Sequence, residues 1–531
     1  MVAAFAAAVL ALSACAPASQ EGWEPPAWAP EVVHATDPVP EISAAADGPL
    51  GAGIVPLRVR NDAVGLQARV ALLPAGATTD AFNAQVEQFV RGAIADRVVA
   101  SGTAFVPAPS AVGSGLGDRR CASGSTRRPA AELLADPAFG PVGGSGTAVV
   151  CGIVAAGGTI VGERVRVVSA DPAGVRFDAT TTLYTDVATG ETAAADGLWT
   201  EHAAAALGAH IVEALRRDAG ALSHRPVVVG DETQIAAIQA ALGSTVPSDE
   251  GLVITLAPGF TAPDLAGLGA PATTEPIEFA IPAEVAADLV SPLGARVLAS
   301  SGQPYTGPVA APAGARAVDC DLVPCVALTY DDGPSSYTPG ILDELAARDA
   351  AATFFAMGQN AQGYADTLAR MTREGHEVEG HTWNHPHLPQ LTDAQVTAQV
   401  VDSTRALEAV SGQDITVFRP PYGEFTPRVL AAAGMPAILW DIDTLDWQGP
   451  ADDVLIARAV EQPRAGSIVL LHDVHAVTAR TAGAVLDGLF DRGVPARHRA
   501  AAVRRGAADV GLLASRPLSV LPPPVRGILP R

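Results

Sequence analysis

The chain has 531 residues, of which 48% are hydrophobic and 17% are charged, so it is long enough for about three domains of roughly 150 residues each. This balance excludes a disordered or collagen-like chain, because such chains lack the apolar residues needed to fill a core. Arginine supplies all 34 basic residues, and the formal charge of −23 disfavours a nucleic-acid partner because an acidic surface repels phosphates.

The amino terminus resembles a bacterial lipoprotein signal. Residues 2–14 are almost entirely apolar, a stretch too short to span a bilayer but typical of a signal peptide (residues 1–14). It ends in Leu12-Ser13-Ala14-Cys15, which resembles a lipobox and implies cleavage before Cys15 and lipid attachment to its thiol. An alanine-rich tail with an incidental cysteine is the alternative. With the lipid signal, we expect a protein anchored on the extracellular face of the membrane, or secreted.

Residues 15–50 follow as a predicted linker, because prolines among small and acidic residues cannot fill a core. If Cys15 carries lipid, four cysteines remain for an oxidising compartment, where thiols tend to pair. Three connectivities are open. Cys320 and Cys325 are close enough to close a small loop, which leaves Cys121 with Cys151. A cysteine metal cluster is the weaker interpretation, because the sequence has no CxxC motif.

Residues 51–300 alternate between strand-like and amphipathic helical segments, which predicts an α+β domain or two small ones. The clearest strands are Ala148–Val154 and Arg164–Val168, and the clearest helices are 80–99 and 201–217. We interpret this region as a binding or spacing module, because it has no group of histidines or paired carboxylates. Segments including Phe177–Val187, Thr189-Gly190, Trp199, Pro282 and Ser291-Pro292-Leu293-Gly294 resemble the domain shared by RsiV-type anti-sigma lipoproteins and some cell-wall deacetylases. Residues 301–317 predict a second linker.

From residue 326 onward apolar strands alternate with helices, which indicates parallel strands with right-handed crossovers and hence an α/β barrel or open sheet. The predicted strands are Val326–Tyr330, Ala352–Phe355, Glu377–Glu379, Thr416–Phe418, Ala437–Trp440 and Ser467–Leu471. The predicted helices are Pro339–Arg348, Ala394–Val410 behind a Thr392/Gln395 capping box, Pro427–Ala433, Asp453–Glu461 and Thr481–Leu489.

Ionisable side chains follow five of these strands, and the carboxyl ends of parallel strands converge on one rim. They are Asp331 and Asp332, His381 and His385, Arg419, Asp443 and Asp446, and His472 with Asp473. On a helical turn His381 and His385 share a face, so both imidazoles can reach one cation together with a carboxylate. Three protein ligands leave one position open, which is typical of a catalytic metal site.

Five motifs appear in order in the segment from about 324 to 493: Thr329-Tyr330-Asp331-Asp332-Gly333-Pro334, His381-Thr382-Trp383-Asn384-His385, Arg419-Pro420-Pro421-Tyr422-Gly423, Trp440-Asp441-Ile442-Asp443-Thr444-Leu445-Asp446-Trp447 and Leu470-Leu471-His472. With these motifs the segment resembles the NodB-type polysaccharide deacetylases, carbohydrate esterase family 4. The first motif has Tyr330 where the family more often has phenylalanine. The resemblance implies a distorted (β/α) barrel over residues 318–493, preceded by the α+β region.

The resemblance also implies roles for individual residues. Asp332, His381 and His385 would hold a divalent metal, with zinc favoured over cobalt, nickel or manganese. Asp331, held by Arg419, would be the general base. The remaining implied roles are an oxyanion contact from the backbone N–H of Tyr422, a general acid in His472, an orienting carboxylate in either Asp443 or Asp446, and a pocket for the acetyl methyl group from Leu470 and Trp447. Asp473 either orients His472 or accepts structural hydrogen bonds, and His376, His387 and His475 receive no role.

The implied activity is removal of N-acetyl groups from an extracellular polysaccharide, with peptidoglycan favoured and acetate released. Chitin oligomers and xylan O-acetyl esters are alternatives for the same site chemistry. A non-catalytic wall-binding or sensing lipoprotein is the alternative of another class.

Residues 494–531 change the composition abruptly, with seven arginines and one acidic residue. We predict no further strand after residue 493. Translation in a shifted reading frame is one hypothesis, and a basic arm that binds anionic wall polymer is the other.

Overall fold

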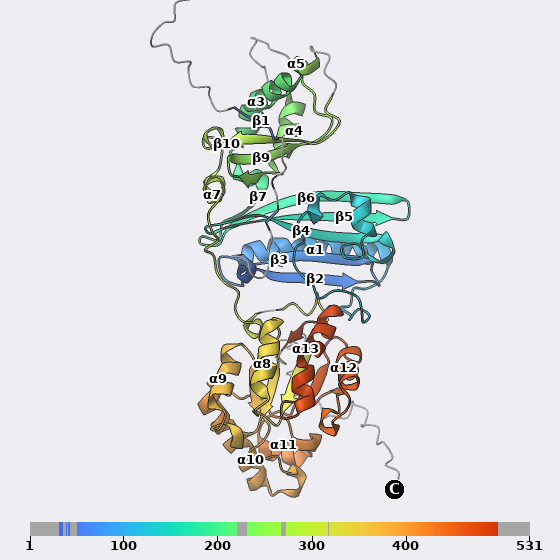
Figure 1. Ribbon diagram of the computed structural model, residues 1–531, viewed down its shortest axis with the longest axis vertical. Helices are drawn as coiled ribbons and strands as arrows, with labels where there is room; N and C mark the ends of the chain where they lie inside the picture. Colours follow the sequence, from blue (N-terminus) through green and yellow to red (C-terminus); the bar gives the residue numbers. More distant parts are fainter. Residues whose placement is uncertain are drawn as a thin grey trace, which may run out of the picture.

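The computed structural model describes residues 31–35, 39, 41–42, 50–219, 231–266, 272–316 and 318–497. The predicted signal peptide, with Cys15, and the chain beyond Arg497 lie outside the described residues. Among the helices described, none is both long and apolar enough to cross a bilayer. Three units follow one another along the long axis of the molecule (Figure 1).

The first unit is an antiparallel four-stranded sheet with helices on it. Val33 and His34 pair with Ala280 and Phe279, and Val32 is fully buried, so this part of the predicted linker 15–50 belongs to a folded unit. A two-residue strand has no periodic pattern that could reveal it. In order, the strands are β1 (Val33–His34), β10 (Ile277–Pro282), β9 (Gly251–Leu256) and β8 (Val246–Ser248), and the helices are α3 (Ala203–Asp218), α4 (Glu232–Leu242), α5 (Pro263–Ala266), α6 (Ala283–Ala286) and α7 (Pro292–Ser300).

The middle unit is a six-stranded mixed sheet, so the region 51–300 forms two units rather than one. Helix α1 (Asp80–Ser101) packs on it, burying Phe82, Val86 and Val90, and α2 (Ala130–Ala135) is a short helix on the same unit. The hairpin of β5 and β6 projects at one edge of the sheet (Figure 1). The strands, in order, are β2 (Val55–Asn61), β3 (Leu66–Leu72), β4 (Gly146–Gly157), β5 (Ile160–Asp171), β6 (Gly174–Asp186) and β7 (Thr192–Ala194).

Two disulfides occur in the described chain, with the pairing that the sequence favours. Cys121 is bonded to Cys151 of β4 in the middle unit, and Cys320 to Cys325 just before the third unit. Both cysteines nearest the third unit are buried.

The third unit is a distorted parallel barrel, which confirms the predicted fold class. Strands β13 (Glu377–Gly380), β12 (Thr353–Ala356), β11 (Val326–Asp331), β15 (Ile468–His472) and β14 (Ile442–Asp443) pair in that order. Parallel bridges from Gly380 to Phe418 and from Phe418 to Ala437 connect β13 toward the segment that carries β14. The barrel therefore closes through an irregular side.

Two predicted strands in this barrel are wrong. The segments 416–418 and 437–440 contribute one bridging residue each, Phe418 and Ala437, and the regular strand lies later, at β14. Proline is the physical reason, because Pro420 follows the first bridge and Pro436 precedes the second, and proline has no N–H to donate to a ladder.

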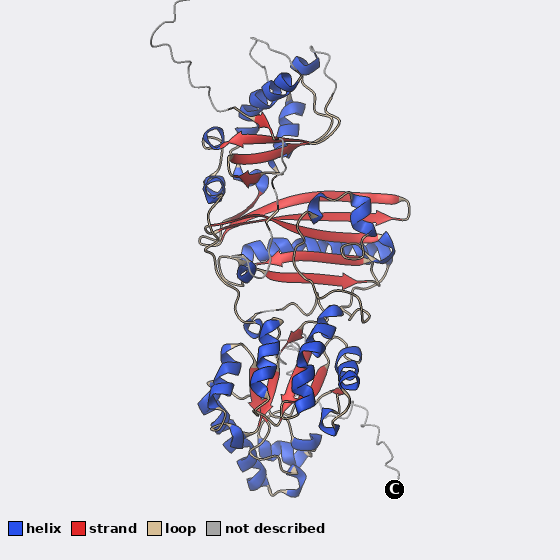
Figure 2. Cartoon of the chain, in the orientation of Figure 1, coloured by secondary structure: helices blue, strands red, loops and turns tan. Residues whose placement is uncertain are grey.

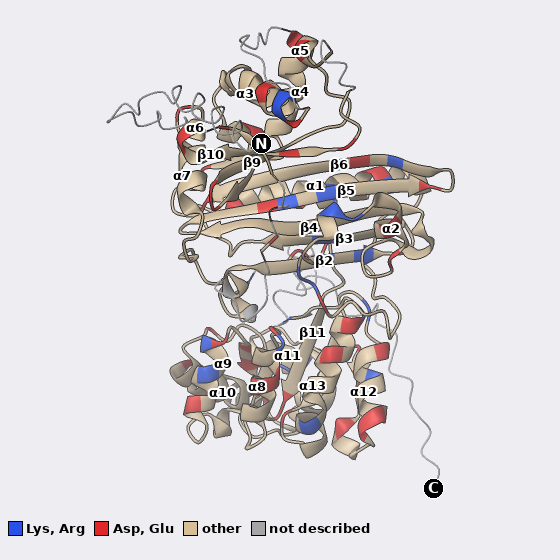
Figure 3. Ribbon diagram, turned by 45° about the horizontal axis from the view of Figure 1, so that its top comes forward, with Lys and Arg blue, Asp and Glu red and all other residues tan. Residues whose placement is uncertain are grey.

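Helices surround the barrel strands (Figure 2). The predicted capping box is present at the start of α10, where Thr392 and Gln395 exchange hydrogen bonds, and the helix ends at Gly412 in a left-handed conformation. Helix α12 begins with Asp452 and Asp453, whose carboxylates suit the positive end of the helix dipole. Figure 3 shows acidic residues on this helix. The helices are α8 (Thr338–Ala347), α9 (Ala365–Arg373), α10 (Asp393–Ser411), α11 (Pro427–Ala433), α12 (Asp452–Glu461) and α13 (Ala476–Asp491).

The middle unit docks on the barrel at the end where the strands begin. Asp491, at the end of α13, accepts hydrogen bonds from the backbone N–H groups of Gly113 (2.6 Å) and Gly115 (2.8 Å). Arg492 donates through Nε to the carbonyl of Ser110 (2.9 Å). The linker 301–317 is also attached, because Tyr305 bridges to Gly158.

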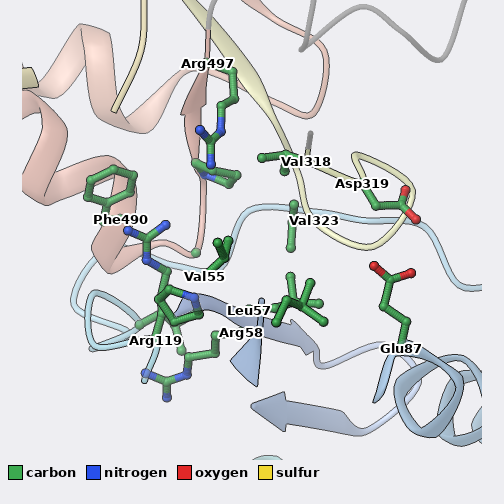
Figure 4. A pocket seen from close by; sticks show the side chains of 15 residues that line it. Val55, Leu57, Arg58, Glu87, Arg119, Val318, Asp319, Val323, Phe490 and Arg497 are labelled. Carbon is green, nitrogen blue, oxygen red and sulfur yellow. The ribbon is translucent and has the colours of Figure 1, made fainter. Parts of the chain in front are cut away.

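A small cavity of about 70 Å³ lies at this junction (Figure 4). Val55 and Leu57 of β2 line it together with Val323, which precedes β11, and Phe490 of α13. The cavity is therefore at the amino-terminal ends of the barrel strands, opposite the ends that carry the ionisable motif residues.

A short strand follows residue 493, so the prediction of none is wrong. Strand β16 (Ala496–Arg497) pairs in parallel with β11, and Val494 and Ala496 are buried in the barrel core. Two residues are too few for an apolar run to stand out in the sequence.

Candidate active site

The carboxyl ends of the barrel strands bring the predicted residues together. Asp331 ends β11 and Asp332 follows it, while His472 ends β15. The remaining residues lie in loops: His381 and His385 follow β13, Arg419 follows the bridge at Phe418, and Asp446 follows β14.

Asp332, His381 and His385 form a group that can hold a metal ion, because one donor atom of each lies within 4.8 Å of the others. The Nε2 atoms of His381 and His385 are each 3.4 Å from Asp332 Oδ1. His381 Nδ1 lies 2.8 Å from the backbone carbonyl of Arg419. Since a carbonyl only accepts, Nδ1 carries the proton and Nε2 presents its lone pair to the site.

Asp332 itself fits a cation. Its Oδ1 is buried and has no hydrogen-bond partner among the described residues. Burial raises the pKa of Asp332, but the neighbouring His381 and His385 outweigh burial and lower that pKa to about 2. The side chain is thus an ionised carboxylate with one buried oxygen directed at two imidazoles, which is the chemistry that a divalent cation requires.

A second group of possible ligands, Cys121, Cys151 and Glu163, does not have this chemistry. The two sulfurs are bonded to each other, so neither is a thiolate. Burial raises the pKa of Glu163 to about 8, which favours the neutral acid at this position.

Asp331 lies beside the three candidate metal ligands and is held by a buried arginine. Arg419 Nη1 donates to Asp331 Oδ1 (2.7 Å) and to Thr329 Oγ1 (2.8 Å). The guanidinium lies over the ring of Phe355, 4.0 Å from its centroid, and is fully buried. The other oxygen of Asp331 is 3.9 Å from His381 Nε2, so it faces the candidate metal ligands.

His472 is paired with Asp446, not with Asp443. Its Nδ1 is 2.8 Å from Asp446 Oδ1, and its backbone N–H donates to Asp446 Oδ2 (2.7 Å). Thr478 donates to the same carboxylate (2.6 Å). Burial lowers the pKa of His472, but the hydrogen bond and charge of Asp446, with Asp331 and Asp332 further away, raise that pKa to about 9.

The two other candidate carboxylates have local partners. Asp443 accepts from the backbone N–H of Leu445 (2.9 Å) within its own loop. Asp473 accepts from Thr338 (2.6 Å), so its side chain has the structural role that the sequence left open. The position of the Asp473 carboxylate also explains why residue 333 is a glycine, because a Cβ atom there would lie 2.1 Å from this carboxylate.

The remaining predicted residues line the same rim. Leu470 of β15 is 3% exposed, whereas Trp447 is 54% exposed and Tyr422 is 55% exposed. Tyr422 adopts a left-handed conformation with φ of 59°. Its ring lies edge-on to His385, with centroids 4.5 Å apart.

Backbone strain marks this rim and gives no signal in the sequence. Six non-glycine residues of the described chain have positive φ, and five of them lie in these loops. Such conformations persist at functional sites because surrounding contacts hold them. The five are Asp332, Thr382, His385, Tyr422 and Leu445.

Sequence reasoning also missed two supporting hydroxyl groups. Thr329 accepts from Arg419 and donates to the carbonyl of Val469 (2.7 Å), and Thr478 bonds Asp446. Threonine is common in strands and helices, so only its position reveals the role.

Comparisons with known proteins agree with this geometry. The family model for polysaccharide deacetylases matches residues 319–437. The peptidoglycan-N-acetylmuramic acid deacetylase PdaC of Bacillus subtilis is 37% identical over 169 residues, covering 32% of this chain and 36% of that protein. The peptidoglycan-N-acetylglucosamine deacetylase PgdA of Listeria monocytogenes is 36% identical over 169 residues, with the same coverage of 32% and 36%. This chain therefore spans about a third of the length of these two relatives.

A chitooligosaccharide deacetylase of Sinorhizobium fredii is 39% identical over 155 residues, which cover 28% of this chain and 72% of that protein. In all three relatives, the identity is confined to a segment about as long as the barrel.

Proposed function

The chain belongs to the polysaccharide deacetylase family, and from this premise we propose that its barrel is a metal-dependent hydrolase that removes N-acetyl groups from an extracellular polysaccharide. The observation that carries the proposal is the meeting of a ligand group, a buried carboxylate and a protonated histidine on one rim. Peptidoglycan is the substrate that we favour, and chitin oligomers are the second candidate, since deacetylases of both classes are among the relatives.

Asp332, His381 and His385 would hold the divalent metal, which we propose to be zinc. Such an ion supplies Lewis acidity that polarises an amide carbonyl and acidifies water. Asp331 is the general base: Arg419 keeps one of its oxygens occupied, and the other faces the site to receive the proton of the attacking water. The backbone N–H of Tyr422 would donate to the oxyanion that develops on the substrate.

His472 is the general acid for the departing amine. With a pKa of about 9 it carries its proton at neutral pH, and Asp446 engages Nδ1, which leaves Nε2 to deliver a proton to the amine nitrogen. Leu470 and Trp447 would contact the acetyl methyl group. The products are acetate and an amino sugar.

Exposed aromatic side chains support a glycan as the substrate. Of the five exposed aromatic residues in the described chain, four lie on this rim, in loops or single 3-10 turns. Exposed apolar surface of this kind marks binding grooves, and flat rings suit the apolar faces of sugars. The four are Tyr337, Trp383, Tyr422 and Trp447.

We also propose that Cys15 is lipidated and that the protein acts outside the cell. A lipobox-like sequence in the amino terminus supports this, as do two disulfides, which form in oxidising compartments. The two accessory units would then act as a binding or spacing module between the membrane and the wall.

Acetate release by the full-length protein tests the proposal. We expect release from purified peptidoglycan, from chitin oligomers, or from both, and we expect a chelator to remove it and added zinc to restore it. Asp331→Asn should lower release at least about 100-fold because the base is lost, yet keep zinc bound. His381→Ala should lose both zinc and activity.

The matched control is Asp453→Asn, which removes an exposed carboxylate on the same barrel and should leave the rate unchanged. If folded, zinc-loaded protein released acetate from neither peptidoglycan nor chitin oligomers, this would contradict the proposed function. Acetylated xylan would then be the next substrate to assay.

A further inference from the structure

His387 and Glu424 form a hydrogen-bonded pair on the rim that the proposed chemistry does not use. His387 Nδ1 is 2.9 Å from Glu424 Oε2, and the two side chains are 46% and 44% exposed. His387 lies two residues after the candidate ligand His385, and Glu424 lies two residues after Tyr422. The pair therefore joins the loop of the metal ligands to the loop of the oxyanion contact.

Ring contacts extend this connection. The imidazole of His387 stacks on the ring of Tyr422, with centroids 4.2 Å apart and planes inclined by 13°. The tyrosine ring also lies edge-on to His385, with centroids 4.5 Å apart and planes inclined by 68°. A continuous series of contacts thus runs from Glu424 through His387 and Tyr422 to His385.

Tyr422 needs such support. A bulky residue with positive φ is unfavourable, and φ is 59° here. Its side chain is 55% exposed, so burial in a core does not hold it in place. The carbonyl of Pro421 accepts a hydrogen bond from the backbone N–H of Glu424 (3.0 Å), which closes the turn around Tyr422. The Glu424 carboxylate then lies within hydrogen-bond distance of His387.

We propose that His387 and Glu424 form a clamp: they are positioning residues that fix Tyr422 relative to the metal ligand His385. His387 holds the tyrosine ring by stacking, and Glu424 holds His387 in the stacking orientation. The backbone N–H of Tyr422 is thereby set at a fixed place with respect to the ligand group. The kinetic part of this inference rests on the proposed function, whereas the effect on the ligand group does not.

Three variants of the full-length protein test the clamp. His387→Ala removes the stacking ring and the hydrogen bond to Glu424, and His387→Phe keeps a stacking ring but removes the hydrogen bond. His34→Ala is the matched control, because His34 and Asp218 form a similar pair with 48% exposure of each side chain in the first unit. The readouts are kcat and KM for acetate release, and zinc affinity measured by competition with a chromogenic chelator.

We expect His387→Ala to lower kcat about tenfold with KM changed less than about twofold, because a displaced donor weakens the transition state more than substrate binding. His387→Phe should recover most of kcat. Zinc affinity should fall by about threefold to tenfold in His387→Ala, since contacts behind a ligand tune its affinity, and His34→Ala should match the wild type in every readout.

Three results would overturn the clamp. The first is a His387→Ala variant that matches His34→Ala in both readouts. The second is a raised KM with unchanged kcat, which would mean that His387 contacts the substrate. The third is His387→Phe as slow as His387→Ala, which would rule out stacking. If the wild type releases no acetate, the proposed function fails, and unchanged zinc affinity in His387→Ala then decides against the clamp by itself.

Discussion

His472 and Asp446 show how one residue sets the protonation of another. Asp446 is buried, which raises the pKa of a carboxyl group, yet its hydrogen bonds from His472 and Thr478 lower that pKa. In return, its negative charge raises the pKa of His472 to about 9 despite the burial of the imidazole. The ring of His475 lies beside this pair, with its centroid 5.6 Å from that of His472. His472 therefore keeps its proton at neutral pH.

The first prediction concerns the pH dependence of this pair. Since His472 donates only when protonated, kcat/KM of the wild type should fall as the pH rises through about 9. Asp446→Asn removes the negative charge that raises the pKa, so the fall should move to lower pH, and activity at pH 8 should drop at least about tenfold. A pH profile of acetate release measures this. An unshifted alkaline limb in the variant would show that another group titrates there.

At the residue scale, position after a strand end was enough to predict which side chains meet, because parallel strands present their carboxyl ends to one rim. It was not enough to separate Asp443 from Asp446. Both lie in one loop, and the left-handed conformation of Leu445, with φ of 54°, directs the later carboxylate toward His472. A turn of this kind at a leucine has no sequence signal.

At the scale of elements, apolar runs and caps predicted the regular strands and helices well. The range of α11, Pro427–Ala433, agrees with the prediction residue for residue, because threonine caps and glycine stops are local signals. The irregular side of the barrel could not be predicted, since its bridges depend on which N–H groups the prolines leave available. Helix α9 and the short strands β1 and β16 were missed as well.

The second prediction belongs to β16. Arg497 is 4% exposed, and burial, with repulsion from Arg119 and Arg316, lowers its pKa to about 10. The attraction of Asp349 partly offsets burial, so Arg497→Ala, which removes this attraction and the buried stem of the side chain, should lower the stability by about 2 kcal/mol. Thermal unfolding of the two proteins measures this, and an unchanged or higher Tm for the variant would contradict it. Intact mass of the purified protein would test the reading frame after residue 493 separately.

At the scale of the whole molecule, the accessory units dock at the opposite end of the barrel from the candidate site. Asp491 is central to that contact, since it accepts two backbone N–H groups of the 113–115 loop. The docking can therefore change without any direct change at the strand ends that carry the ligand group.

The third prediction separates docking from chemistry. Asp491→Ala removes both carboxylate acceptors, so the amide hydrogens of Gly113 and Gly115 should exchange faster, by about tenfold for about 1.4 kcal/mol of lost protection. Hydrogen exchange measures this, and kcat should stay within about twofold of the wild type. Unchanged exchange would mean that the loop is held by its other contacts, and a large loss of kcat would show that the two ends of the barrel are coupled.

The β5–β6 hairpin offers a practical use of this arrangement. Its turn at Pro172 and Ala173 is exposed and belongs to the middle unit, so it lies far along the chain and in space from the rim that we assign to chemistry (Figure 1). A fluorescent or affinity label inserted at this turn would report where the protein resides in a living cell and allow its recovery on a support, while the glycan-facing rim remains open.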